Sequence, residues 1–272
     1  MGMVVRTNIM GINANRQLGM NNNQVSKSLE KLSSGYRINR AGDDASGLAI
    51  SEKMKAQIKG LEQASSNAQD AISLVQTAEG ATTEIHNMLN RMVELTTKAA
   101  NGIYDTGVDR PAITAELAAL ATEISRITTS TKFNSTVLLD GTLDTQLQIG
   151  TEGTDTLAVT VTALDADSLG VSGLDVSSAA AANSALADVK AAINTVSTAR
   201  ADLGAIQNRL EYTINNLDTT AENMSAANSR IRDTDMAKEM MNYTKMNVLT
   251  QAAQAMLAQA NQQPQAVLQL LQ

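Results

Sequence analysis

The sequence MNVLTQAAQAMLAQANQQPQAVLQLLQ, residues 246–272, ends the chain and contains no charged side chain. Small and apolar residues recur in it at alternating steps of three and four, which is typical of a helix that packs on other helices. These residues are Met246, Leu249, Ala253, Met256 and Ala260. Glutamines fill many of the remaining positions, and their amides carry polar groups that a membrane-spanning helix avoids. Because isolated helices of this length are marginal in water, we expect the segment to become ordered only among copies of itself.

The start of the chain has the same character, because only three charged residues precede Glu30. The apolar residues from Leu18 to Leu32 fit a heptad seam whose skipped position is Asn22. Two charge-poor amphipathic ends are natural partners, and neither can bury both of its faces within one chain. We therefore predict that the ends make contacts between copies. The side chains predicted to do so are Ile9, Ile12, Leu18, Val25 and Leu29 near the start and Leu249, Met256, Val267, Leu268, Leu270 and Leu271 near the end.

At 272 residues the chain is long enough for one or two domains with a real core. It is 43% hydrophobic but has no Trp, one Phe and four Tyr, so its core must consist of aliphatic side chains and Met. The net charge of −7 argues against general nucleic-acid binding, and the absence of Cys excludes disulfides and thiol chemistry. The first twelve residues lack the pattern of a cleaved secretory signal. We expect a protein that stays in the cytoplasm or leaves by a route that needs no such signal.

Two long heptad patterns dominate the middle of the sequence. The first runs over residues 54–99 with one phase slip near Gly80, and Asn101-Gly102 ends it. A shorter helix is predicted over residues 109–127. The second long pattern runs over residues 186–231 and is expected to lie antiparallel to the first.

The pattern changes from helix to strand after Phe133. Asp140-Gly141 separates two short apolar runs, which is a strong signal for a tight hairpin turn. A second hairpin is predicted from the alternating residues at 147–149 and 157–161. Residues 165–182 are small, acidic and polar, and they predict a surface linker or turn.

Together these patterns predict a mainly α fold, an elongated antiparallel helical bundle or coiled coil with a small β-hairpin region at its tip. We expect the terminal helices, residues 1–43 with 233–272, to form one domain that mediates polymerisation. We expect residues 44–232 to form a helical rod domain that carries the β-hairpins at about 134–165.

Candidates for catalysis and for metal or cofactor binding are few. His86 is the only histidine and no HExxH motif is present, so His86 is expected to be solvated or partly packed. Asp43 and Asp44 are consecutive and do not converge on one substrate, so they are expected to cap the helix that follows them. No glycine-rich phosphate-binding motif is present. We therefore predict no catalytic, metal or cofactor site and no enzymatic activity.

Four segments carry a resemblance to a known family, bacterial flagellin. SLEKLSSGYRIN (28–39) and DDASGLAIS (43–51) resemble its amino-terminal signature, and SRIRDTDMA (229–237) and LAQANQQPQAVLQLL (257–271) resemble its carboxy-terminal signature. The resemblance covers about residues 7–162 and 179–272, whereas the opening MGMVV differs from the usual flagellin start. Residues 149–179 leave no room for the variable outer domains that many flagellins carry.

The resemblance implies a short flagellin that polymerises into a hollow flagellar filament for motility, with its terminal helices forming the inner tube. It implies secretion through the flagellar export channel to the extracellular filament, without nucleic-acid binding or membrane insertion. The implied partners are further copies of the chain, a flagellar export chaperone, and the filament cap and junction proteins.

Two alternatives to the filament subunit remain open at this point. One is a hook-filament junction protein, which resembles flagellin at both ends. The other is a secreted ligand or adhesin that is sensed by a host toll-like receptor. The receptor-contact residues that the resemblance carries over to this sequence are Arg91, Leu95 and Glu116.

Overall fold

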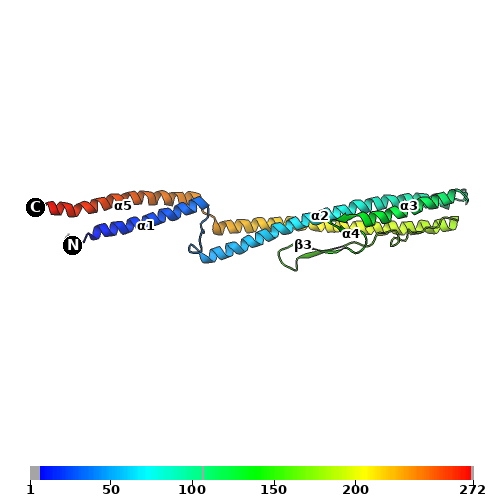
Figure 1. The fold of residues 1–272 in the computed structure, drawn as a ribbon, viewed down its shortest axis with the longest axis horizontal. Helices are drawn as coiled ribbons and strands as arrows, with labels where there is room; N and C mark the ends of the chain where they lie inside the picture. Colours follow the sequence, from blue (N-terminus) through cyan, green and yellow to red (C-terminus); the bar gives the residue numbers. More distant parts are fainter. Residues whose placement is uncertain (1–6, 106, 271–272) are drawn as a thin grey trace. The chain divides into compact units, whose positions relative to one another are not determined.

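The computed structural model describes residues 7–105 and 107–270, with side chains described as far as residue 262. Within these residues the chain is mainly helical with two short strand pairs, as predicted. The helices are α1 (Ile9–Ser34), α2 (Ala45–Ala100), α3 (Asp109–Ser130), α4 (Ala179–Arg232) and α5 (Met236–Leu270) (Figure 1). The strands are β1 (Lys132–Phe133), β2 (Thr136–Val137), β3 (Asp144–Gln148) and β4 (Thr156–Thr160).

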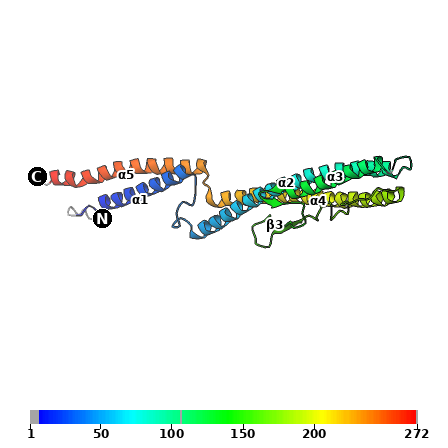
Figure 2. The same cartoon turned by 45° about the vertical axis from the view of Figure 1, so that its right-hand side comes forward.

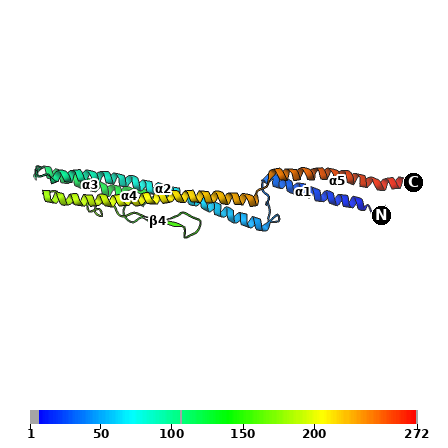
Figure 3. The ribbon, with the colours of Figure 1, turned by 180° about the vertical axis from the view of Figure 1, so that it is seen from behind.

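The contacts divide the chain into a terminal unit, residues up to 56 and from 223 onward, and a central unit, residues 57–222. In the terminal unit α1 and α5 run antiparallel along each other, as predicted for the two charge-poor ends (Figure 3). Buried and half-buried residues recur along α1 at steps of three and four: Gly11, Ala14, Leu18, Asn21, Val25, Ser28 and Leu32. Asn21 rather than Asn22 therefore occupies the polar position of this seam, and Leu29 lies outside it.

The seam on α5 follows the same periodicity. Its half-buried residues are Glu239, Tyr243, Met246, Thr250, Ala253, Leu257 and Ala260. Three members of the predicted helix seam, Met246, Ala253 and Ala260, thus lie on the packed side of α5. The other two, Leu249 and Met256, are exposed. The alternating spacing thus correctly predicts a helix, but the predicted seam combines residues from two sides of α5.

The core of the central unit lies between α2, α3 and α4, and the β3–β4 pair packs beside these helices (Figure 2). Along α4 the buried positions are mostly small over residues 182–199, and leucines follow: Ala182, Ala185, Val189, Ala192, Val196, Ala199, Leu203, Leu210 and Leu217. Small side chains let the helices approach closely, so aliphatic residues of α2 such as Ile85 and Leu89 fill the space between them. Each buried Leu or Ile there contributes roughly 1.5–3 kcal/mol, which explains how this core forms almost without aromatic residues.

The hairpin turn predicted at Asp140-Gly141 is wrong. The first strand pair, β1 and β2, turns instead at Asn134 and Ser135, which both have positive φ, 44° and 70°. Positive φ at both central residues matches the two-residue turns whose twist suits antiparallel strands. Asp140-Gly141 lies in a separate turn after the buried Leu139, whose carbonyl accepts a hydrogen bond from Leu164 N at 3.0 Å. The segment that ends at Leu139 is thus bonded to the distant residue Leu164, and not to the residues that directly follow Asp140-Gly141.

The second predicted hairpin is confirmed. Strands β3 and β4 pair antiparallel with Leu147 opposite Leu157, and Leu157 and Val159 point into the core. This alternation of buried and exposed residues is expected of a strand with one solvated face.

The surface linker or turn predicted over residues 165–182 is right in part, because the segment forms turns but also buries several side chains. Ala166, Leu169, Val171 and Val176 are buried in the central core, and α4 already begins at Ala179. Two hydrogen bonds tie this segment to α3, from Ala166 N to Ser125 Oγ (3.3 Å) and from Arg110 Nη1 to Val176 O (3.4 Å). The segment therefore covers the core instead of looping away from it.

Candidate assembly surface

A cluster of polar and aromatic side chains fixes the α1–α5 pair where α1 ends and α5 begins. Tyr36 and Asp233 form an isolated β-bridge, and the guanidinium of Arg232 lies 4.5 Å from the centre of the Tyr36 ring. Arg232 Nη1 is also 2.6 Å from Glu52 Oε1, and only 13% of the Arg232 side chain is exposed. Because charge-assisted and cation–π contacts are directional, this cluster holds the two helix ends in one arrangement.

Two acids close the loop between α1 and α2. Asp44 Oδ1 accepts a hydrogen bond from Gly47 N at 2.8 Å and caps the start of α2, as predicted. Asp43 Oδ2 instead accepts hydrogen bonds from the backbone N–H groups of Arg40 (3.0 Å) and Asn39 (3.1 Å) in the preceding turn. These bonds, first that from Arg40 and then that from Asn39, hold the pKa of Asp43 below its ordinary value because they stabilise the charged carboxylate.

Asn8 joins the far end of the helix pair. Its Oδ1 accepts from Gly11 N at 2.9 Å and caps α1, while its Nδ2 donates to Ala260 O on α5 at 2.8 Å. In a regular helix the carbonyl of Ala260 accepts from the backbone N–H of residue 264, but residue 264 is Pro and has none. Asn8 therefore supplies the donor that Pro264 lacks. One side chain thus satisfies orphan groups on two helices and sets the register between them.

Replacing Asn8 by Ala is expected to destabilise the α1–α5 pair by about 2 kcal/mol, because a helix cap and a donor to a part-buried carbonyl are lost together. The decisive measurement is a double-mutant cycle with Pro264→Ala, which returns a backbone N–H to Ala260 O. Asn8→Ala should cost about 1 kcal/mol less in the Pro264→Ala background, measured by thermal or denaturant unfolding of the assembled protein, in which we expect α1 and α5 to be ordered. Strictly additive effects of the two substitutions would contradict this register role.

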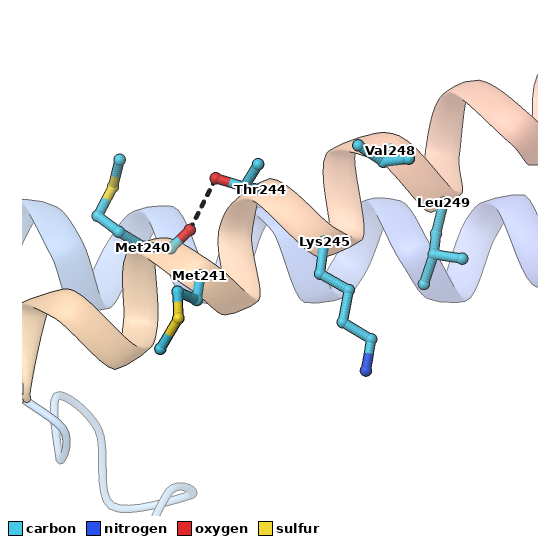
Figure 4. A pocket seen from close by; sticks show the side chains of 6 residues that line it. All are labelled: Met240, Met241, Thr244, Lys245, Val248 and Leu249. Atoms are coloured by element: carbon cyan, nitrogen blue, oxygen red, sulfur yellow. Dashed lines mark hydrogen bonds between the residues drawn. The ribbon is translucent and has the colours of Figure 1, made fainter.

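The side of α5 opposite its packed seam carries an open apolar groove (Figure 4). Met240, Met241, Val248 and Leu249 line it, together with Thr244 and Lys245. Thr244 Oγ1 donates to Met240 O at 2.9 Å, so its hydroxyl is satisfied within the helix and leaves the groove apolar. Met256 is exposed one heptad beyond Leu249. An apolar stripe of this kind on an exposed helix face is typical of an interaction site.

Among the predicted contact residues of α1, Ile9, Ile12 and Leu29 are exposed on the free chain. Leu18 and Val25 instead lie half-buried on the seam with α5. On α5, Leu249 and Met256 are exposed. The side chains of Val267, Leu268 and Leu270 and the whole of Leu271 lie outside the described residues. The two helices thus present apolar side chains on faces that their own pairing does not use.

The structure places the predicted receptor-contact residues together in the central unit. Arg91 on α2 pairs with Glu116 on α3 (Nη2–Oε1 2.9 Å) and with Glu94 (Nη1–Oε2 2.8 Å). These two hydrogen-bonded carboxylates, Glu94 first and then Glu116, raise the pKa of Arg91 above its ordinary value. Leu95 is only 3% exposed and belongs to the core beneath them. Arg91 and Glu116 are the exposed residues of the predicted contact, and Leu95 lines the hollow beside them.

His86 is half-buried on α2, and its Nδ1 is buried without a hydrogen-bond partner in the described structure. Over residues 7–105 and 107–270, no three His, Asp or Glu side chains come close enough together to hold a metal ion. None of the described helices combines the length and apolar character needed to cross a membrane.

Sequence reasoning missed two parts of this surface, the groove residues Met240, Met241 and Val248 and the contact made by Asn8. A signal for the groove was present, because Met241 and Val248, like Leu249 and Met256, are seven residues apart. The Asn8 contact had only an indirect signal, a proline inside a helical pattern, which leaves a carbonyl without its donor.

Comparisons with known proteins agree with this architecture. The model of the bacterial flagellin N-terminal helical region matches residues 5–144, and that of the C-terminal helical region matches residues 186–271. A flagellin from Halalkalibacterium halodurans is 53% identical, over 99% of this chain and 100% of that protein. The crystal structure of Bacillus cereus flagellin is 33% identical with a TM-score of 0.50, over 60% of this chain and 94% of that one.

A structure from Vibrio parahaemolyticus, assigned to the flagellar hook-associated proteins, matches with a TM-score of 0.60 over 70% of this chain and 100% of that one. Its sequence identity is 15%, so this similarity is one of fold alone. Both ends of the sequence match the flagellin models, and full-length identity to a flagellin exceeds half. The chain therefore belongs to the bacterial flagellin family.

Proposed function

We propose that this chain is the repeating structural subunit of a bacterial flagellar filament and that it polymerises through its terminal helices. Family membership supports the first part of this proposal. The single observation that carries the second part is the set of apolar side chains left exposed on both α1 and α5 after these helices have paired with each other.

The positions of these side chains favour assembly into an open polymer. The α5 groove lies opposite the packed seam, and Ile9 and Ile12 lie exposed near the start of α1. Contacts between two different patches of identical subunits are heterologous, and such contacts generate helical filaments when they do not close into a ring. The terminal helices, residues 1–43 with 233–272, would then form the polymerisation domain, and residues 44–232 the rod domain.

The charge distribution supports the same proposal. Residues 246–272 carry no charge, and a tube of identical subunits brings equivalent side chains of neighbours near one another. Like charges at such positions would repel, whereas amides and apolar groups make compatible neighbours. The terminal helices are thus suited to form the wall of a tube in which each copy is surrounded by further copies.

Electron microscopy of the purified protein after salt-induced assembly tests the proposal. A filament subunit yields long filaments of uniform diameter, whereas a hook-filament junction protein, the nearest alternative, yields none. Our assignment would be contradicted if the protein forms no filaments under the salt and protein concentrations at which another flagellin polymerises.

We further propose that the chain is exported through the flagellar secretion channel to the cell exterior, with a flagellar export chaperone, filament cap and junction proteins as its partners. An absence of Cys and a scarcity of aromatic residues support this, since such a chain has no disulfides to break and little aromatic core to unpack before threading. Secretion into the medium by a cap-deficient strain, and its loss in an export-deficient strain, is the test.

Recognition of the free monomer by a host toll-like receptor is a second candidate role, favoured by the exposed Arg91–Glu116 ion pair on the surface of α2 and α3. Arg91→Ala and Glu116→Ala are each expected to reduce receptor activation about tenfold, as loss of a central charged contact at an interface does. Arg126→Ala is the matched control, because Arg126 forms an equally exposed ion pair with Glu123 on α3.

A cell-based receptor assay on purified monomers measures this difference. Equal activation by the Arg91 and Arg126 variants would contradict the receptor role. Motility of a strain that lacks the gene then separates the two roles, since only a filament subunit is required for swimming.

A further inference from the structure

The methionines of the described chain differ in exposure, and Met54, Met224 and Met246 of the terminal unit are half-buried. Met10, Met20, Met236, Met240, Met241 and Met256 are exposed, and all six belong to the terminal unit. In the central unit, by contrast, Met92 is fully buried and Met88 is half-buried. The sequence has no Cys and no Trp, so thioethers are the side chains most easily oxidised by a peroxide. The unit proposed to polymerise is thus also the unit that exposes oxidisable sulfur.

Met240 and Met241 differ from the other exposed methionines because they line the apolar groove together with Val248 and Leu249 (Figure 4). Met241 is 67% exposed and its thioether is drawn free of the helix. The only charged side chain that lines the groove within the described residues is Lys245. A change from thioether to sulfoxide there would replace two apolar groups that line the groove by strong dipoles.

We propose that Met240 and Met241 form an oxidation site at which a peroxide switches off self-assembly of the free chain. The inference rests on the proposed function, because it assumes that the α5 groove is covered by a second copy in the filament. Each thioether sulfur attacks one oxygen of hydrogen peroxide, and an S–O bond forms as the O–O bond breaks. The departing hydroxide takes the proton of the transferred S–OH group, which leaves a sulfoxide and water. The sulfur loses two electrons and the peroxide gains them.

The sulfoxide opposes assembly because its oxygen must give up water when a neighbour covers the groove. Burying such a group without a hydrogen-bond partner weakens association about tenfold or more. The same covering protects Met240 and Met241 once the subunit is in place, because a peroxide no longer reaches them. Oxidation therefore acts on the free chain and spares the assembled filament.

The test exposes monomers and preassembled filaments to hydrogen peroxide and measures sulfoxide by peptide mass spectrometry and assembly by sedimentation. The oxidised wild-type monomer is expected to assemble only at a protein concentration at least about tenfold higher than the untreated monomer needs. Met240→Leu combined with Met241→Leu keeps the volume of both side chains. In a Met256→Leu background, which removes the exposed thioether one heptad beyond Leu249, this double variant should assemble equally well, within about twofold, before and after oxidation. Met92 should remain unmodified throughout, and Met240 and Met241 should be modified much less in filaments than in monomers.

Met10→Leu combined with Met20→Leu is the matched control, because it removes two exposed methionines from α1 and should leave the oxidation sensitivity intact. Equal loss of assembly in both double variants after oxidation would overturn the proposal. If the Met240 and Met241 variant does not assemble even before oxidation, a second measurement tests the site. Oxidised wild-type protein is treated with methionine sulfoxide reductases, and its assembly is measured again. Recovery that follows removal of these two sulfoxides supports the site, and absence of recovery refutes it. Untreated wild type that forms no filaments would overturn the proposed function as well, whereas oxidised wild type that assembles normally overturns the oxidation site alone.

Discussion

A chain truncated after Gln262 is expected to stay monomeric, helical and soluble under conditions in which the full chain forms filaments. The ten residues removed contain Val267, Leu268, Leu270 and Leu271 and no charge. Covering one such side chain contributes roughly 1.5–3 kcal/mol, and each 1.4 kcal/mol is about a factor of ten in affinity. Loss of all four should therefore raise the concentration needed for assembly by at least about a thousandfold. Sedimentation and electron microscopy measure the loss, and circular dichroism checks that the helices remain.

Two full-length variants separate the apolar contacts from the mere length of the chain. Replacing Val267, Leu268, Leu270 and Leu271 by Ser should block assembly as the truncation does. Replacing Gln263, Gln265 and Gln269 by Ser changes the same segment without removing apolar area, and it should permit assembly. Normal filament growth from the truncated chain, or equal failure of both full-length variants, would contradict a role for the apolar residues.

Val248→Glu is expected to produce the second large effect, a chain that folds normally but does not polymerise. Val248 is 59% exposed and lines the α5 groove, so the substitution changes the stability of the monomer by no more than about 0.5 kcal/mol. In a filament a neighbour would cover the same carboxylate, and Lys245, the one charged side chain that lines the groove within the described residues, would offset only part of the cost of removing that charge from water. Sedimentation after salt-induced assembly should show at least about a hundredfold loss.

The matched control for Val248→Glu is Ile103→Glu. Ile103 is another exposed aliphatic side chain, 82% exposed, but it lies in the central unit between α2 and α3. This variant should polymerise like the wild type if assembly depends on the terminal helices. Polymerisation of the Val248 variant at wild-type concentrations would place the intermolecular contact elsewhere than in the α5 groove.

Much of the helical fold could be predicted from the sequence because its signal is periodic. The heptads that begin near Met54 and Leu186 correspond to α2 and α4, and the two charge-poor ends pair as α1 and α5. Periodicity does not show which side of a helix meets which partner. The spacing therefore places Leu249 and Met256 in the same predicted seam as Met246. In the structure Met246 is half-buried, whereas Leu249 and Met256 are exposed.

The errors arose where tertiary contacts decide the structure. Asp140-Gly141 has strong local turn chemistry, but the neighbouring Leu139 is buried and bonded to Leu164, so no hairpin forms around it. Residues 165–178 have a polar average composition, and their buried residues, such as Leu169 and Val176, follow no regular period. Composition and periodicity thus both miss a segment that is anchored by a few isolated side chains.

The candidate site could be predicted in outline, because the charge-free ends indicate α1 and α5, and Ile9, Ile12, Leu29, Leu249 and Met256 on these helices are exposed. The contact of Asn8 with Ala260 could not be predicted, because it joins residues 252 positions apart. Only the folded helix shows that the Ala260 carbonyl lacks a backbone donor. The contact depends on the absence of one N–H at Pro264, a feature with no periodic signal.

Amide hydrogen exchange of α1 and α5 in a dilute, strictly monomeric sample and in filaments tests the central claim most directly. If the terminal helices complete their packing only among copies, their amides will exchange quickly in the monomer and slowly in the filament, while the buried parts of α2 and α4 stay protected in both. Full protection of α1 and α5 already in the monomer, unchanged on assembly, would contradict the account.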